Sequence, residues 1–285
     1  MPDKKISVII VSYNVSSYLE RCIKSVYDTE NFSDLEIVIV DNNSSDESVS
    51  IIKNKFPECM LIENNRNLGF SKAVNIGISK SNADYICILN PDTLVKKNTF
   101  SELYYFLSVS PNTGVAGAKI LNPDGSFQVS SRRNFPTIPG LAYKYIGLSR
   151  LFPMSKVFGY YNHTYIDSDQ GHKTDSVSGA CMMFKRKLVD IIGNFDENFF
   201  MYFEDTDYCI RAASVGYDVF FNPKAQIVHY GGKSWEKSNL DSSEVFYSSA
   251  KLFFYKYKQR LRYRNLSILM LRAGFFIRKK MSILY

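Results

Sequence analysis

The apolar residues of the first hundred positions fall into short uninterrupted runs separated by amphipathic stretches. The run at residues 6–11 is β-branched at every position except Ser7, which is typical of a strand covered on both faces. Runs at 35–40, 60–62 and 85–89 predict three further strands, and helical apolar spacing predicts helices at 18–27, 46–56 and 69–79. Strands and helices that alternate in this way predict right-handed βαβ units. The fold class is therefore α/β, with a mostly parallel central sheet.

The alternation weakens after residue 90. Helices are predicted at 100–107, 187–192 and 205–215, and strands at 115–120, 176–185, 218–222 and 225–229. Residues 126–175 show no clear period and are rich in Tyr, Pro and Gly. A long irregular segment in a compact domain is usually functional or mobile. We divide the chain into one domain at 1–250, with halves 1–120 and 121–250, and a tail at 251–285.

Charge separates the tail from the rest of the chain. Ten basic and no acidic residues follow position 250, so the first 250 residues carry a net charge of −3, against +7 for the whole chain. This acidic body argues against nucleic-acid binding. The five cysteines are widely spaced without a CxxC pair, which indicates reduced thiols in a cytosolic protein. We find no signal peptide, and no run reaches the ~18 apolar residues of a membrane span.

Polar side chains follow three of the predicted strands. They are Ser12-Tyr13-Asn14, the loop from Asp41 to Asp46, and Asn90-Pro91-Asp92. Ligands of open α/β sheets bind beyond the carboxyl ends of the strands, so these segments are candidate binding loops. GxGxxG and GxxxxGK[ST] are both absent, which argues against dinucleotide and P-loop chemistry.

Single residues at these strand ends could bind a ligand, or they could have only a structural role. Asp41 can accept hydrogen bonds from a ribose or a base. Asp92 can bind a hard divalent cation together with substrate phosphates, although an Asn-Pro-Asp turn is more often structural. His229 closes an apolar run and can complete a metal shell if Asp92 is near, or else is a core histidine.

Three carboxylates lie within residues 203–207, between an apolar run and a helical stretch. Neighbouring carboxylates raise one another's pKa, which suits a general base. The alternative is a solvated helix start, where acidic side chains offset the helix dipole. Similarly, the arginines at 132 and 133 either bind phosphate or are solvated.

Taken together, these motifs resemble family 2 glycosyltransferases of the GT-A fold, close to the bacterial rhamnosyltransferase-like branch. The matching stretches run in family order from residue 6 to about 235. They are SVIIVSYN at 7–14, IVIVDNNSSDES at 37–48, NLGFSKAVNIG at 67–77, ILNPDT at 88–93, RRNFPT at 132–137, SGACMMF at 178–184, the segment 193–211 ending in FEDTDYCIR, and HYGGKS at 229–234.

The resemblance implies a role for each matching residue. Asp205 would be the catalytic base and Glu204 would position the acceptor or sugar, while Asp92 and His229 would bind Mg²⁺ or Mn²⁺. Asn90 stands where most of the family has a first metal-binding carboxylate, which implies weaker, donor-dependent metal binding. The donor would contact the remaining residues, namely Ser12, Tyr13, Asn14, Asp41, Asn43, Asn67, Gly69, Phe70, Asn75, Asn90 and Arg132.

The resemblance also implies an activity. It is inverting transfer of a sugar from a nucleotide-diphosphate donor, with dTDP-rhamnose favoured, to a glycan or lipid-linked glycan in cell-surface polysaccharide synthesis such as that of O-antigen. A non-catalytic nucleotide- or glycan-binding module is the alternative, and the substitution at Asn90 is its best support. The sequence identifies neither the sugar, the acceptor nor the linkage.

Residues 251–285 alternate basic and aromatic side chains. This pattern suits an amphipathic helix lying peripherally on an anionic membrane, here the inner face of the plasma membrane. A helix packed on the domain and a homodimer contact are the alternatives.

Overall fold

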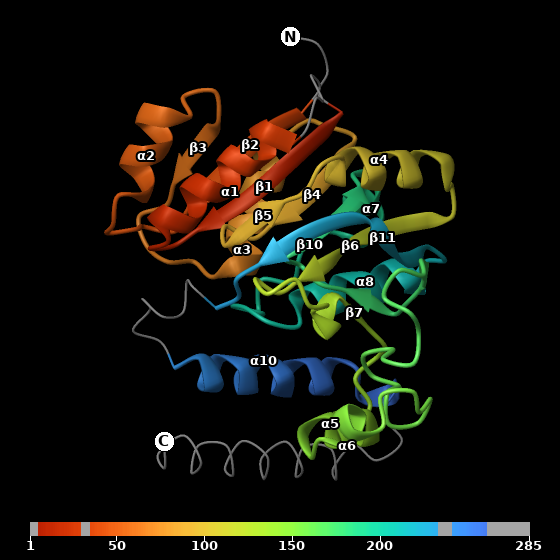
Figure 1. The fold of residues 1–285 in the computed structure, drawn as a ribbon. Coiled ribbons are helices and arrows are strands. Elements are labelled where there is room, and N and C mark those ends of the chain that lie inside the picture. The colour runs from red at the N-terminus through yellow and green to blue at the C-terminus, as the bar shows by residue number, and fades with distance from the viewer. Residues whose placement is uncertain (1–4, 30–34, 233–240, 261–285) are drawn as a thin grey trace.

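The computed structural model describes residues 5–29, 35–232 and 241–260. Nine strands from these residues form one mixed sheet, with β3-β2-β1-β4-β10-β6-β11-β5 as its main path (Figure 1). β1 (Ile6–Ser12) lies between β2 (Leu35–Asp41) and β4 (Tyr85–Leu89), parallel to both, and β3 (Met60–Glu63) extends the parallel set. Every residue of β1 is buried, as its β-branched run predicts. The α/β class with a central, mostly parallel sheet is thus confirmed.

One antiparallel strand joins the two halves of the sheet. β10 (Cys181–Lys185) pairs with β4 on one side and with β6 (Thr113–Leu121) on the other. β11 (Asp218–His229) runs parallel to β6, and two short strands, β5 (Thr93–Val95) and β8 (His172–Lys173), pair with β11. Strands from residues 1–120 and from residues 121–250 therefore share a single sheet.

Two predictions about strands were wrong in detail. The strand expected at 176–185 is interrupted, and its first part, β9 (Ser176–Val177), pairs with β7 (Arg132–Arg133) in a separate small sheet. The two strands expected at 218–222 and 225–229 form the single strand β11. A bulge separates Asn222, opposite Ala118, from Gln226, opposite Lys119. Pro223 lies within this bulge, where a missing N–H is tolerated.

Helices cover both faces of the sheet. One face packs against α1 (Ser16–Thr29), α2 (Ser48–Lys55) and α4 (Thr99–Val109), and the other against α3 (Phe70–Lys80), α7 (Lys187–Ile192) and α8 (Glu204–Ser214). Segment 126–175 also contains helices that its sequence did not indicate. These are the 3₁₀ turn η1 (Val129–Ser131), α5 (Ile138–Tyr145) and the one-turn α6 (Leu148–Leu151). They are too short for a helical period to stand out.

The helix α10 (Ser242–Lys256) crosses residue 250, where we divided the domain from the tail. Phe253 and Phe254 on α10 are fully buried against Phe199 and Ile210, so the start of the predicted tail packs on the domain. The turn η2 (Lys258–Arg260) follows, and positions 261–285 of the predicted amphipathic tail lie outside the described residues. In the part of the chain that is described, no helix has both the length and the apolar character needed to cross a bilayer.

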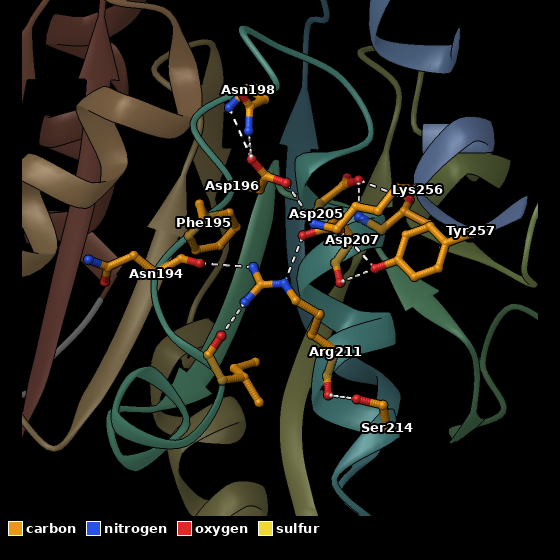
Figure 2. Close-up of polar contacts among 12 residues, drawn as sticks. Asn194, Phe195, Asp196, Asn198, Asp205, Asp207, Arg211, Ser214, Lys256 and Tyr257 are labelled. Carbon is orange, nitrogen blue, oxygen red and sulfur yellow. Dashed lines mark hydrogen bonds and ion pairs between the residues drawn. The ribbon is translucent and has the colours of Figure 1, made fainter. Parts of the chain in front are cut away.

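A buried carboxylate attaches α10 to α8 (Figure 2). Asp207 is fully buried, and its Oδ1 lies 2.6 Å from the Lys256 ammonium and accepts a 2.8 Å hydrogen bond from the Tyr257 hydroxyl. Its Oδ2 accepts a 2.8 Å bond from Arg211, which also donates to the carbonyls of Ile192 and Asn194. Asp207 thus holds α8, α10 and the loop after α7 together.

Replacing Asp207 should destabilise the fold strongly. In Asp207→Ala, Arg211 and Lys256 lose a carboxylate from a buried network, and we expect a loss of about 3 kcal/mol in the free energy of unfolding. Asp28→Ala is the matched control, because its ion pair with Lys24 is exposed and should contribute less than about 1 kcal/mol. Urea denaturation followed by circular dichroism measures both. Equal effects of the two variants would contradict the structural role of Asp207.

Candidate active site

Two chain segments bring a carboxylate and an imidazole together at one edge of the sheet. His229 is the last residue of β11, and it lies opposite Thr93 of β5 in an antiparallel pair. Because Asp92 immediately precedes β5, the His229 Nε2 lies 3.2 Å from the Asp92 Oδ1 and 3.2 Å from the Asn90 amide nitrogen. The structure therefore groups these three residues, although 137 residues separate Asp92 from His229 along the chain.

The donor atoms of this corner fit a divalent cation. The His229 Nδ1 lies 3.0 Å from the Gln128 Oε1, and in the tautomer that donates this hydrogen bond, Nε2 keeps its lone pair toward Asp92. Metal-binding histidines are commonly oriented by such a bond from the other ring nitrogen. The described residues contain no group of three or more acidic, histidine or cysteine side chains able to hold a metal. Asp92 and His229 would therefore need further oxygen ligands from a substrate.

A second polar group lies at the carboxyl ends of β1 and β2. Asp41 is buried, and both its oxygens accept hydrogen bonds from Ser44, at 2.8 Å from the backbone N–H and 2.6 Å from the hydroxyl. Ser12, opposite Asp41 in the sheet, is buried, and its hydroxyl has no partner among the described residues. The Asn14 Oδ1 accepts a 2.7 Å bond from the Ser45 N–H. These contacts fix the loop and leave Ser12 and Asp41 able to bond a ligand.

Tyr13 is partly buried beside this group, and Asn43 is exposed in the loop. Asn14 and Asn43 both have a positive φ, of 53° and 65°, a conformation that asparagine tolerates better than most residues. Their asparagine side chains therefore have a conformational role in addition to any contact with a ligand.

Several residues expected at the donor pocket instead connect α3 to the segment before α8. The Asn75 side chain exchanges hydrogen bonds of 2.9 and 3.0 Å with the backbone of Phe195. The Phe70 N–H donates to the Phe200 carbonyl at 2.6 Å, and a Cβ on Gly69 would lie 2.7 Å from that same oxygen. The Asn67 Oδ1 accepts a bond from the Gly69 N–H. Asn75 and Phe70 therefore join α3 to the segment before α8, and their predicted place at the donor pocket stays a prediction.

Arg132 makes its contacts within the protein. Its side chain is almost fully buried, and its guanidinium donates to the carbonyls of His163, Ile166 and Asp167. It also lies over the rings of Phe127 and Phe221, at 5.1 and 4.7 Å. These contacts use Arg132 to hold the 126–175 segment in place, and its predicted contact with the donor stays a prediction.

The neighbouring arginine reaches the carboxylate cluster. The Arg133 Nη2 lies 2.6 Å from the Asp205 Oδ2, which also accepts a 3.0 Å bond from the Gly179 N–H. The Asp205 Oδ1 accepts bonds from the N–H and hydroxyl of Thr206, at 2.6 and 3.1 Å. Four donors within the described residues therefore occupy both oxygens of Asp205, which matches the number of lone pairs of a carboxylate.

Glu204 has the opposite surroundings. It is 6% exposed, and its Oε2 has no hydrogen-bond partner among the described residues. Burial, together with the charge of Asp205, raises the pKa of Glu204 to about 8. The sequence indicated a carboxylate pair with one raised pKa, but it did not show which member had the free oxygen. Gln128 and Arg133 are further site residues that the sequence did not single out for these roles.

The fold is that of the GT-A class of proteins. A mannosyltransferase from Pyrobaculum calidifontis, solved with GDP-Man and Mn²⁺, matches with a TM-score of 0.60 and 17% identity, over 96% of this chain and 72% of that one. The structure of GalNAc-T7 with UDP, GalNAc and Mn²⁺ matches with a TM-score of 0.60 and 18% identity, over 80% of this chain and 44% of that one.

Sequence comparison gives the family. Residues 7–193 match the model of glycosyl transferase family 2, and residues 150–278 match that of glycosyl transferase family group 2. The chain therefore belongs to glycosyl transferase family 2, and it is a glycosyltransferase.

Two curated relatives cover most of this chain. An N-acetylglucosaminyl-diphospho-decaprenol L-rhamnosyltransferase of Mycobacterium tuberculosis is 25% identical, over 86% of this chain and 82% of its own length. A low-salt glycan biosynthesis hexosyltransferase of Haloferax volcanii is 28% identical, over 93% and 81%.

His163, in the segment that Arg132 holds, should make the stability of the folded protein depend on pH. Burial, followed by the charges of His172 and Arg132, lowers the pKa of His163 to about 4. Between pH 6.5 and 4 the unfolded chain binds a proton at this position that the folded protein does not, so stability should fall as the pH falls through this window. Thermal melts from pH 8 to 4.5 measure the effect. His163→Gln should flatten the profile, and an unchanged profile in that variant would contradict the assignment.

Proposed function

We propose that the protein is an inverting, metal-dependent glycosyltransferase that moves a sugar from a nucleotide-diphosphate donor to a hydroxyl of a glycan or lipid-linked glycan. The observation that carries the proposal is the convergence of Asp92 and His229 at the carboxyl edge of the sheet. The Mycobacterium tuberculosis relative, which matches most of this chain, is named as a rhamnosyltransferase. This similarity favours dTDP-rhamnose as the donor and cell-surface polysaccharide as the product. The proposed location is the cytoplasm, at the inner face of the plasma membrane.

In this proposal Ser12 and Asp41 bind the nucleoside through the unpartnered hydroxyl and the remaining lone pairs of the carboxylate. Asp92 and His229 hold Mg²⁺ or Mn²⁺, with Gln128 orienting the imidazole. The bound cation supplies charge neutralisation to the leaving diphosphate. With the amide of Asn90 in place of a second carboxylate, the corner has lower negative charge, so metal binding should depend on the donor.

The acceptor hydroxyl gives up its proton to the Glu204–Asp205 pair as it attacks the sugar from the face opposite the diphosphate. From the family pattern, Asp205 is the expected base. The contacts support an exchange of roles, since Asp205 accepts four hydrogen bonds while the Glu204 Oε2 accepts none from the described residues. We therefore assign Glu204 as the proton acceptor and Asp205 as the residue that positions it, with Arg133 holding Asp205.

A non-catalytic nucleotide- or glycan-binding module remains the alternative, supported by Asn90. Turnover separates the two. A binding module would be stabilised by nucleotide-sugars without hydrolysing or transferring any of them.

Loss of either proposed metal ligand should remove the cooperation between donor and metal. In a thermal-shift screen of dTDP-rhamnose, UDP-sugars and GDP-sugars, we expect Mn²⁺ to increase the stabilisation by the correct donor in the wild type. Asp92→Asn and His229→Ala should abolish that increase. The exposed variant Asp28→Asn is the control and should behave like the wild type. An increase by Mn²⁺ that survives in both variants would place the metal elsewhere.

The two carboxylates should differ in their effect on the pH profile of transfer. Glu204 must be ionised to accept a proton, so kcat should rise with pH through about 8 in the wild type. Glu204→Gln should lower kcat by roughly 10²–10⁴ and remove this rise, with donor binding retained. Asp205→Asn should lower kcat and also the melting temperature, because it weakens the ion pair with Arg133.

The roles are reversed if Glu204→Gln retains the rise in kcat with pH while Asp205→Asn abolishes transfer at an unchanged melting temperature. Wild-type turnover by both variants would refute the site as a whole.

A further inference from the structure

An exposed apolar face lies outside the proposed active site, in the segment around α6. Six large hydrophobic side chains between positions 146 and 160 are 39% to 76% exposed. We call this group the α6 face, and it consists of Ile146, Leu151, Phe152, Met154, Val157 and Tyr160. Large exposed apolar side chains gathered in one short surface segment commonly mark a contact surface.

The charged side chains of the segment that contains the α6 face have one sign. No Asp or Glu occurs between Asp124 and Asp167, whereas Lys144, Arg150 and Lys156 lie beside the apolar residues and are exposed. Apolar side chains accompanied only by cations suit the boundary between the headgroups and acyl chains of an anionic bilayer.

The same charge pattern disfavours a second copy of the chain. A symmetric dimer would place this face against itself, which brings Arg150 and Lys156 close to their own copies. The segment supplies no carboxylate to offset that repulsion.

The α6 face is structurally connected to the proposed acceptor side. Leu141 of α5 packs against the cluster that contains Phe253 and Phe254 of α10. The Asn134 side chain donates to the Tyr160 carbonyl at 2.8 Å, and the preceding residue, Arg133, binds Asp205. Figure 1 shows α5 and α6 beyond α10, at the end of the molecule away from β2 and β3.

We propose that the α6 face inserts into an anionic lipid surface and so places the acceptor side of the enzyme against the membrane. Exposed apolar side chains enter the boundary region, and Arg150 and Lys156 bind lipid phosphates. The inference goes beyond the proposed function, because it concerns a surface separate from the site and holds whatever sugar is transferred.

Sedimentation of the full chain with lipid vesicles tests the proposal. Vesicles of phosphatidylglycerol and phosphatidylcholine are compared with vesicles of phosphatidylcholine alone. Arg150→Gln with Lys156→Gln should lower the partition coefficient on the anionic vesicles about 25-fold, or about fivefold for each cation. Leu151→Ser with Met154→Ser should lower the partition coefficient on both kinds of vesicle.

The control is Tyr105→Ser with Val109→Ser, which removes two exposed apolar side chains from α4 and should leave binding unchanged. Melting temperatures confirm that each variant is folded. Wild-type partition by both α6-face variants would overturn the proposal. A second outcome would also overturn it. The wild type would form an oligomer by light scattering, and the α6-face variants would dissociate this oligomer while their vesicle binding stayed unchanged.

The vesicles contain no acceptor, so the assay is independent of transfer. Vesicle binding that needs the α6 face, in a protein that transfers no sugar, would refute the proposed function and leave this inference standing.

Discussion

The burial of three carboxylates in the first turn of α8 is the constraint on which the packing around this helix depends. The cost of burial is offset in a different way for each carboxylate. Asp207 is neutralised by Arg211, Lys256 and a tyrosine hydroxyl, while Asp205 is held by Arg133 and three further donors. Glu204 has no cation in contact among the described residues, and its pKa rises to about 8. A single helix start therefore combines a structural anchor, a carboxylate held by an arginine and a carboxylate whose raised pKa suits proton transfer.

The partners of these carboxylates come from distant parts of the chain. Arg133 lies in β7, Lys256 at the end of α10, and the Gly179 N–H in the turn before β10. The segments that surround α8 are thus arranged by electrostatic pairing in addition to apolar packing. This explains why Phe253 and Phe254 of α10 are buried in the domain although residue 251 begins a strongly basic stretch.

The parallel half of the sheet was predictable, because buried β-branched runs and helical spacing leave few alternatives. The proximity of Asp92 and His229 was a conditional expectation, and it is realised through β5, a three-residue strand too short to recognise in the sequence. The choice between Arg132 and Arg133 could not be predicted. Neighbouring residues on a strand point to opposite sides, so only one of the two could reach Asp205, and nothing local indicates which. The hydrogen bonds of Asn75 were likewise not predictable, because its partner, Phe195, is distant in sequence.

The bulge in β11 has a consequence for how this chain can vary in length. Between Asn222 and Gln226, three residues of β11 have no counterpart on β6. Because side chains alternate along a strand, a shift of one residue in the pairing after the bulge would turn His229 to the other side of the sheet. The pairing of Gln226, Ile227 and Val228 with β6 therefore fixes the side on which His229 lies. A change in length at the bulge is compatible with the position of His229 only if the bulge absorbs it, and the buried side chain of Ala225 restricts how far the bulge can do so.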